Sequence, residues 1–183
     1  LVEALIGDAG WRTPMLIASG LTLAAGVLVV AVVRDGPYVP ATSRFDRHAA
    51  FRLFTTPGAR QATLGYLGHM WELYAMWTWV AAFATASLVA AGAADAARGG
   101  SSVAFVAIAS GTIGCVLAGW IGDRAGKARI AAAALVVSGA CCAITPLVYG
   151  APAAVLVVLV SVWGFAVVAD SAQFSAVVAE HTE

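Results

Sequence analysis

Charged residues are scarce in this chain, and the places where they are absent are informative. Only 11% of the 183 residues are charged, whereas a soluble domain has about 25%. Residues 101–121 and 130–149 contain no Asp, Glu, Lys, Arg or His. With 61% hydrophobic residues, the chain could not cover a water-facing surface of normal polarity. The composition therefore excludes an ordinary soluble domain and predicts a membrane protein.

Cysteine pairs and the common catalytic motifs are also missing. Cys115, Cys141 and Cys142 lie inside apolar stretches, without CxxC spacing or a nearby His, and we expect them to be small packing residues. The sequence contains no HExxH and no GxSxG motif. We therefore expect no metal site, no cofactor, no enzymatic activity and no nucleic-acid partner.

Five long apolar stretches predict five membrane-spanning helices. At a rise of about 1.5 Å per residue, about 20 apolar residues cross the core of a bilayer. The predicted spans are 13–33, 62–91, 101–121, 130–149 and a fifth that begins at Pro152. The fifth is clearly apolar to Ala169, and we expect it to continue to about Val178. The predicted fold is an all-α, polytopic membrane helix bundle.

The chain reads as part of a longer protein. It has no initiator Met and no signal peptide, and it opens in what reads as the end of an apolar helix. We therefore expect an incomplete bundle with helices missing on both sides. Residues 1–33 would end a first bundle, 34–61 would form a basic central loop, and 62–183 would belong to a second bundle.

Lys and Arg are concentrated on one side of the predicted membrane. Five lie in the loop 34–61 and three in the turn 122–129, so these segments hold eight of the ten. Because cytoplasmic loops are enriched in Lys and Arg, we expect both segments in the cytoplasm, with the protein in a bacterial inner membrane. Within the loop, residues 45–54 are either an amphipathic helix on the headgroups or a solvated linker.

A short polar turn joins the third and fourth predicted spans. Before it, small residues recur every four positions, which allows close helix packing in lipid. Gly126 permits the chain reversal, and Asp123 can pair with Arg124 or with the N-terminus of an adjacent helix. Such a turn can act as a conformational latch between helices, or it can be a simple topological stop. The residues of the predicted latch are Gly119, Asp123, Arg124, Gly126, Lys127 and Arg129.

The pattern Gly119-x-x-x-Asp123-Arg124-x-Gly126-Lys127-x-Arg129 resembles the cytoplasmic signature loop of the major facilitator superfamily, in its copy between the eighth and ninth helices. Ala128 departs from it, since a basic residue is common there. The segment Gly10-Trp11-Arg12-Thr13-Pro14 is similar to the family's external turn before the sixth helix. The resemblance implies that the spans are helices six to ten of a transporter, whose missing helices and lipid bilayer would be partners of this chain.

The second predicted span carries two ionisable residues, His69 and Glu72, which are three positions apart and share a helix face. Glu72 would lie roughly 15 Å inside the membrane. A carboxylate at that depth costs at least about 2.5–3.5 kcal/mol unless it has a partner or faces water. Burial would favour its protonated form and make it a proton carrier with His69 as relay. Alternatively, the two residues form a fixed structural pair, or Glu72 is a countercharge for the substrate.

The fifth span adds Asp170 and Gln173, again three positions apart. Asp170 is interfacial if the helix ends near Ala169 and intramembrane if the helix continues, which we expect. Among the aromatic residues of the second span, we expect Tyr66 and Trp77 to contact a substrate cavity.

These features predict a secondary active transporter that moves a small-molecule substrate by alternating access, with protons as the coupling ion. Two alternatives stay open: a membrane-embedded enzyme that uses His69, Glu72 and Asp170, and a sensor or scaffold that binds without transport. The sequence leaves the substrate open, and it does not separate symport, antiport and uniport.

Overall fold

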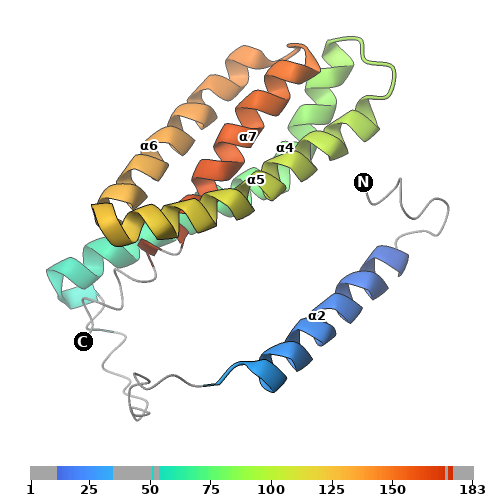
Figure 1. The fold of residues 1–183 in the computed structure, drawn as a ribbon. Helices are drawn as coiled ribbons and strands as arrows, with labels where there is room; N and C mark the ends of the chain where they lie inside the picture. The colour runs from blue at the N-terminus through green and yellow to red at the C-terminus, as the bar shows by residue number, and fades with distance from the viewer. Residues whose placement is uncertain (1–11, 35–50, 52–53, 172, 175–183) are drawn as a thin grey trace. The chain divides into compact units, whose positions relative to one another are not determined.

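The computed structural model describes residues 12–34, 51, 54–171 and 173–174. In these residues the chain is helical, as predicted, and contains no strand (Figure 1). The chain divides into two units, one with α2 and the other with α4 to α7, and each is described by itself. The elements are α2 (Arg12–Val32), α4 (Pro57–Ala90), α5 (Ala96–Ala125), α6 (Lys127–Ile144), the short 3-10 helix η1 (Thr145–Val148) and α7 (Ala153–Ala169).

Four helical segments are long and apolar enough to cross a membrane: Arg12–Val32, Pro57–Ala90, Ala96–Ala125 and Lys127–Val148. They correspond to the first four predicted spans. At the fifth predicted span the structure has α7, a shorter apolar helix of 17 residues. Every described side chain of α2 is at least partly exposed, as expected for a helix that faces lipid or helices outside its unit.

The start of the second span differs from the expectation. Helix α4 begins at Pro57, where proline suits the first helical turn, so residues 57–61 belong to the helix and not to the loop. After α7 a further helical hydrogen bond is present, in which the amide of Phe174 donates to the carbonyl of Asp170 at 2.9 Å. The predicted continuation to Val178 lies outside the described residues. So do Gly10 and Trp11 of the external turn and most of 45–54.

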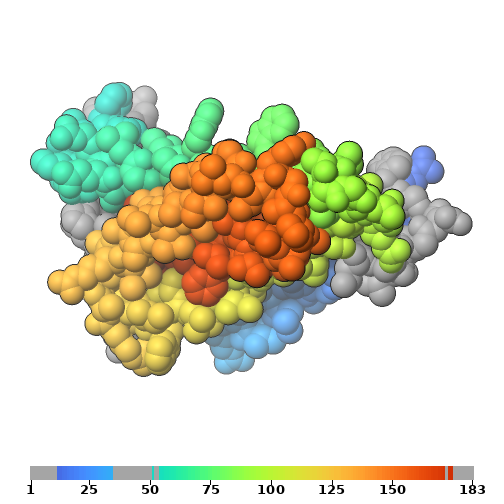
Figure 2. Space-filling model, turned by 90° about the horizontal axis from the view of Figure 1, so that it is seen from above, coloured from blue at the N-terminus to red at the C-terminus, as the bar shows by residue number. Residues whose placement is uncertain are grey.

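Helix α7 contacts all three other helices of the second unit and packs most extensively against α5. In the view of Figure 2, α7 (red) is largely covered and is seen between α5 (yellow) and α6 (orange). Leucine, valine, methionine and alanine side chains from three helices form the main apolar core. Its buried members are Leu73, Met76, Val80, Ala84, Val103, Ala104, Ala107, Val160 and Val167.

The contact between α5 and α7 depends on glycine. A Cβ atom at Gly114 would overlap the carbonyl group of Phe165, and one at Gly164 would overlap the carbonyl group of Ala107. The two backbones therefore approach more closely than any larger residue allows, which is how helices associate in lipid. This confirms the expected close packing for the small residues of α5 that are buried here: Gly111, Gly114, Ala118 and Gly122. Gly119 does not share this role, because a Cβ atom there would meet nothing within 4 Å.

The predicted polar turn is shorter than expected. Gly126 alone separates α5 from α6, and its φ of 96° is a backbone conformation that favours glycine. Asp123 and Arg124 consequently lie in the last turn of α5, while Lys127 and Arg129 lie in the first turn of α6. The motif is a helix reversal, not a loop.

The other two connections lie together at the opposite end of the unit (Figure 1). The amide of Gly150, in the connection before α7, donates to Ser87 Oγ near the end of α4 at 2.9 Å. The reversal at Gly126 and the end of α7 are therefore on one side, and the connections at 91–95 and 149–152 are on the other. This up-and-down order agrees with the predicted topology.

Candidate functional site

Two ionisable side chains, His69 on α4 and Asp170 directly after α7, are buried against each other. His69 is 0% exposed and Asp170 is 1% exposed, and His69 Nδ1 lies 2.9 Å from Asp170 Oδ1. The two atoms lack the alignment of a hydrogen bond, and neither has another hydrogen-bond partner in the described part of the chain. Below, these two residues are called the buried pair. Such incompletely bonded buried groups are rare in native structures and point to a special role.

The other ring nitrogen of the histidine also has a partner. Ser171 Oγ lies 2.8 Å from His69 Nε2. When the proton is on Nδ1 and faces Asp170, Nε2 can accept the hydroxyl hydrogen of Ser171. Tyr66 stacks on the imidazole with ring centroids 6.0 Å apart, and Phe174 lies on it at 5.9 Å. The imidazole is thus fixed by one polar contact at each nitrogen and by two aromatic rings.

Gln173 connects the end of α7 to the reversal between α5 and α6. Its side chain is 3% exposed, and a Cβ atom at Gly122 would lie 2.6 Å from its Oε1 atom. Gly122 precedes Asp123 in the signature motif. Gln173, three residues after Asp170, therefore packs against Gly122, the neighbour of the predicted latch residue Asp123.

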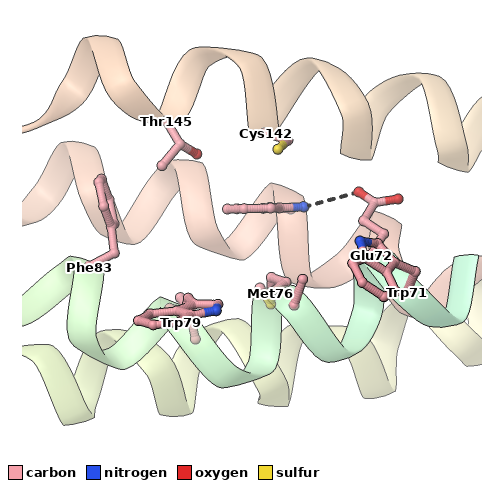
Figure 3. A pocket seen from close by; sticks show the side chains of 10 residues that line it. Trp71, Glu72, Met76, Trp79, Phe83, Cys142 and Thr145 are labelled. Atoms are coloured by element: carbon pink, nitrogen blue, oxygen red, sulfur yellow. Dashed lines mark hydrogen bonds between the residues drawn. The ribbon is translucent and has the colours of Figure 1, made fainter. Parts of the chain in front are cut away.

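Glu72 has different partners from His69, although the two share a face of α4. Ser138 on α6 donates a hydrogen bond to Glu72 Oε1, and Trp163 Nε1 on α7 donates to the same oxygen at 3.4 Å (Figure 3). No hydrogen bond between His69 and Glu72 is present among the described residues. The carboxylate thus bridges three helices and is not the fixed partner of His69.

A pocket of about 380 Å³ opens beside Glu72. Residues of α4 form one wall, and Cys142 of α6 and Thr145 of η1 face them (Figure 3). Trp163 of α7 completes the lining. The α4 residues of the wall follow helical spacing, so one face of the helix builds it. The lining residues are Trp71, Glu72, Ala75, Met76, Trp79, Val80, Phe83, Cys142, Thr145 and Trp163.

The structure brings together some of the predicted site residues and separates others. His69 and Asp170 form the buried pair, and Tyr66 stacks beside them. Trp77 is 40% exposed, meets Tyr74 edge-on at 6.1 Å, and lines neither the pocket beside Glu72 nor a second, open pocket of α4. In the described residues, no three His, Cys, Asp or Glu side chains are placed to hold a metal ion.

Sequence reasoning missed three side chains of the site: Ser138, Trp163 and Ser171. Ser138 is the one polar residue near the middle of the fourth predicted span and is 1% exposed. A hydroxyl at that depth can bond to a polar partner on a neighbouring helix or to its own backbone, so its position alone did not identify Glu72 as the partner.

The reversal has contacts of its own. Arg124 donates from a guanidinium nitrogen to the carbonyl of Trp120 at 2.7 Å, and its guanidinium carbon lies 4.2 Å from the centre of the Trp120 ring system. Among the described residues, no ion pair joins Asp123 to Arg124. Asp123 lies in the last turn of α5, where the helix dipole disfavours a negative charge.

Apolar helices of membrane-spanning length, joined by short connections and holding polar side chains between them, are the features of an integral multi-pass membrane protein. The model of the family described as "Major Facilitator Superfamily" matches residues 1–183 of the chain. The chain therefore belongs to the major facilitator superfamily and is part of a membrane transporter. No curated protein and no solved structure matches it significantly.

Proposed function

We propose that this protein is a secondary active transporter that couples the movement of a small solute to protons by alternating access. The observation that carries the proposal is the buried pair, because it places two titratable groups between α4 and the residues after α7. Ionisable residues in such positions of membrane transporters mark proton or substrate pathways.

The chemistry of the pair suits proton coupling. With a protonated His69 beside an ionised Asp170, the two charges attract each other and hold α4 and the end of α7 together. A further proton on the carboxyl group removes that attraction, while loss of the proton from His69 leaves a buried carboxylate beside a neutral ring. Each proton exchange therefore changes the free energy of the contact between α4 and the end of α7. Glu72, which faces the pocket, would carry the change to the substrate.

Asp123 supports the alternating-access part of the proposal. Its carboxylate lies at the unfavourable end of the α5 dipole, without an ion pair in the described residues. A partner that Asp123 gains in another conformation would stabilise that conformation. In this proposal the reversal is a latch whose charged residues are engaged in one state and released in the other.

Proton-coupled transport is tested with the full-length protein in liposomes that contain a pH-sensitive dye. A panel of small metabolites and drugs is added outside. We expect at least one compound to change the internal pH, and we expect Asp170→Asn to abolish the change. Asp95→Asn is the control, because Asp95 is exposed in the connection at 91–95 and only caps α5 through the Arg98 amide.

Other outcomes would contradict the proposal. Transport of a compound without any pH change would indicate a uniporter, and saturable binding without transport would indicate a sensor. The contacts Asp170–His69–Ser171 follow the order of a hydrolase triad, but the contact between His69 and Asp170 lacks the hydrogen bond that a triad has. Neither described pocket includes these residues, and we do not propose an enzyme.

A further inference from the structure

The pocket beside Glu72 combines one negative charge with several aromatic rings. Of the ten described residues that line it, Glu72 alone is charged, and none is Lys, Arg or His. Indole rings come from Trp71 and Trp79 on α4 and from Trp163 on α7, and Phe83 adds a fourth aromatic side chain. The faces of aromatic rings carry negative partial charge and attract cations.

The carboxylate of Glu72 keeps binding capacity for a ligand. Both of its hydrogen bonds in the described residues go to one oxygen, Oε1, from Ser138 and from Trp163. The other oxygen, Oε2, has no hydrogen bond there. A carboxylate accepts through both oxygens, so Oε2 can accept a hydrogen bond or an ionic contact from a bound molecule. The hydrogen bonds to Oε1 meanwhile hold the group in place.

We propose that this pocket binds a small organic cation, that is, a protonated or quaternary amine with an apolar body. The proposal rests on the transport function proposed above and names the substrate class for it. The cationic head lies at Glu72 Oε2, and the apolar body lies among Trp79, Phe83 and Trp163. The volume of about 380 Å³ is within the range of small-molecule sites.

The composition of the pocket disfavours the other common solutes. An anion would meet the Glu72 carboxylate without a cationic residue among the lining side chains, at a cost in binding free energy. A sugar would need several polar partners, whereas the uncharged lining offers chiefly the hydroxyl of Thr145, the thiol of Cys142 and indole N–H groups. An uncharged apolar molecule, such as a lipid chain, would fill the space but would not use Glu72. It is therefore the alternative that the experiment has to separate.

The experiment measures binding of radiolabelled benzyltrimethylammonium to the full-length protein in detergent. Unlabelled N,N-dimethylbenzamide, which is uncharged and of similar size, and the anion benzenesulfonate are the competitors. We expect saturable binding that neither competitor displaces efficiently. Glu72→Gln should weaken binding about tenfold or more, because it removes a charged partner. Glu72→Asp, which restores the charge, should recover part of the loss, and Asp95→Asn should change nothing.

A second pair of variants keeps the test decisive if Glu72→Gln does not fold. Trp79→Leu removes an exposed ring that lines the pocket, and Phe105→Leu removes an exposed ring of α5 outside it. The first should weaken cation binding and the second should not. Equal binding of the uncharged amide, or an unchanged affinity in both Glu72→Gln and Trp79→Leu, would overturn the proposal.

The same ligands separate this inference from the proposed function. If benzyltrimethylammonium binds through Glu72 but no compound moves protons or crosses the liposome membrane, the cation site stands and proton-coupled transport fails. If another solute is transported with protons while the cation does not bind, the transport function stands and the cation site fails.

Discussion

His69 on α4 and Asp170 directly after α7 face each other, and both side chains have almost no exposed surface. Removing one member of a buried pair leaves the other without compensation, at a cost of about 3–5 kcal/mol. We expect His69→Asn and Asp170→Asn each to lower the thermal unfolding temperature of the full-length protein in detergent. The double variant should lose less than the sum of the two, because the residues interact directly.

Asp123→Asn is the control for this cycle. Asp123 is an exposed carboxylate without an ion pair in the described residues, so its substitution should leave the unfolding temperature unchanged or raise it slightly, because it removes a negative charge from the end of α5. Strictly additive effects of the two buried substitutions would show that the 2.9 Å contact contributes no coupling energy.

The ionisable members of the site could be predicted from the sequence, but their partners could not. Charged residues in apolar spans are costly, so His69, Glu72 and Asp170 were conspicuous. Ser138 was not, because serine and threonine are tolerated in such helices by bonding to a carbonyl one turn back. Thr78 does this in α4, where its Oγ1 donates to the carbonyl of Tyr74 at 2.7 Å. Only the positions of the helices show that Ser138 bonds to Glu72 instead.

At the scale of helices, the contact between α5 and α7 depends on the missing side chain of Gly114. A methyl group there would overlap the backbone of Phe165. Overpacking a tight contact costs about 1–3 kcal/mol, and we expect Gly114→Ala to lower the unfolding temperature in detergent. Gly139→Ala in α6 is the matched control, because its new methyl group would meet no atom within 4 Å. Its effect should be neutral or slightly stabilising.

Equal unfolding temperatures for the two alanine variants would contradict the close packing of α5 on α7. The contrast between the two glycines also shows the limit of the sequence pattern. Spacing of small residues predicted a tight helix contact, but it did not specify α7 as the neighbour.

The reversal between α5 and α6 depends on a single backbone conformation. At Gly126 the φ of 96° and ψ of 125° suit a residue without a side chain. Holding another residue there costs about 1–3 kcal/mol. We expect Gly126→Ala to destabilise the protein and to slow transport, as measured by unfolding and by solute uptake into liposomes.

Gly119→Ala is the matched control for the stability measurement. Gly119 is in the last part of α5, and a methyl group there would contact nothing within 4 Å. If both variants unfold at the same temperature, the positive φ at Gly126 carries no strain for alanine and the argument fails.

At the scale of the whole molecule, the two ends of the second unit should face different compartments. The basic turn at Gly126 is predicted to be cytoplasmic, and the connection at 91–95 external. In a background without native cysteines, Ala93→Cys and Ala128→Cys place thiols at these ends, both at exposed positions. We expect a membrane-impermeant maleimide to label the first in intact cells and the second only after permeabilisation. The reverse pattern would invert the topology.

Spans were predictable at this scale because bilayer thickness fixes the length of an apolar helix. For example, the uncharged stretch 130–149 predicted a span that covers most of the observed segment Lys127–Val148. The order in which helices pack was not predictable, because nearly every face of these helices is apolar. Polar residues separated by about a hundred positions, such as His69 and Ser171, meet only when that order is set.

The burial of His69 and Asp170 also limits the rate at which a proton of the pair exchanges with solvent. Because neither side chain is appreciably exposed, water cannot reach a proton on His69 Nδ1 while α4 and the residues after α7 stay in contact. Exchange of that proton with bulk solvent requires the two segments to separate first. The hydrogen–deuterium exchange rate at the His69 ring would therefore report how often this contact opens. A substrate that changes this rate would do so by changing the opening equilibrium of the helices.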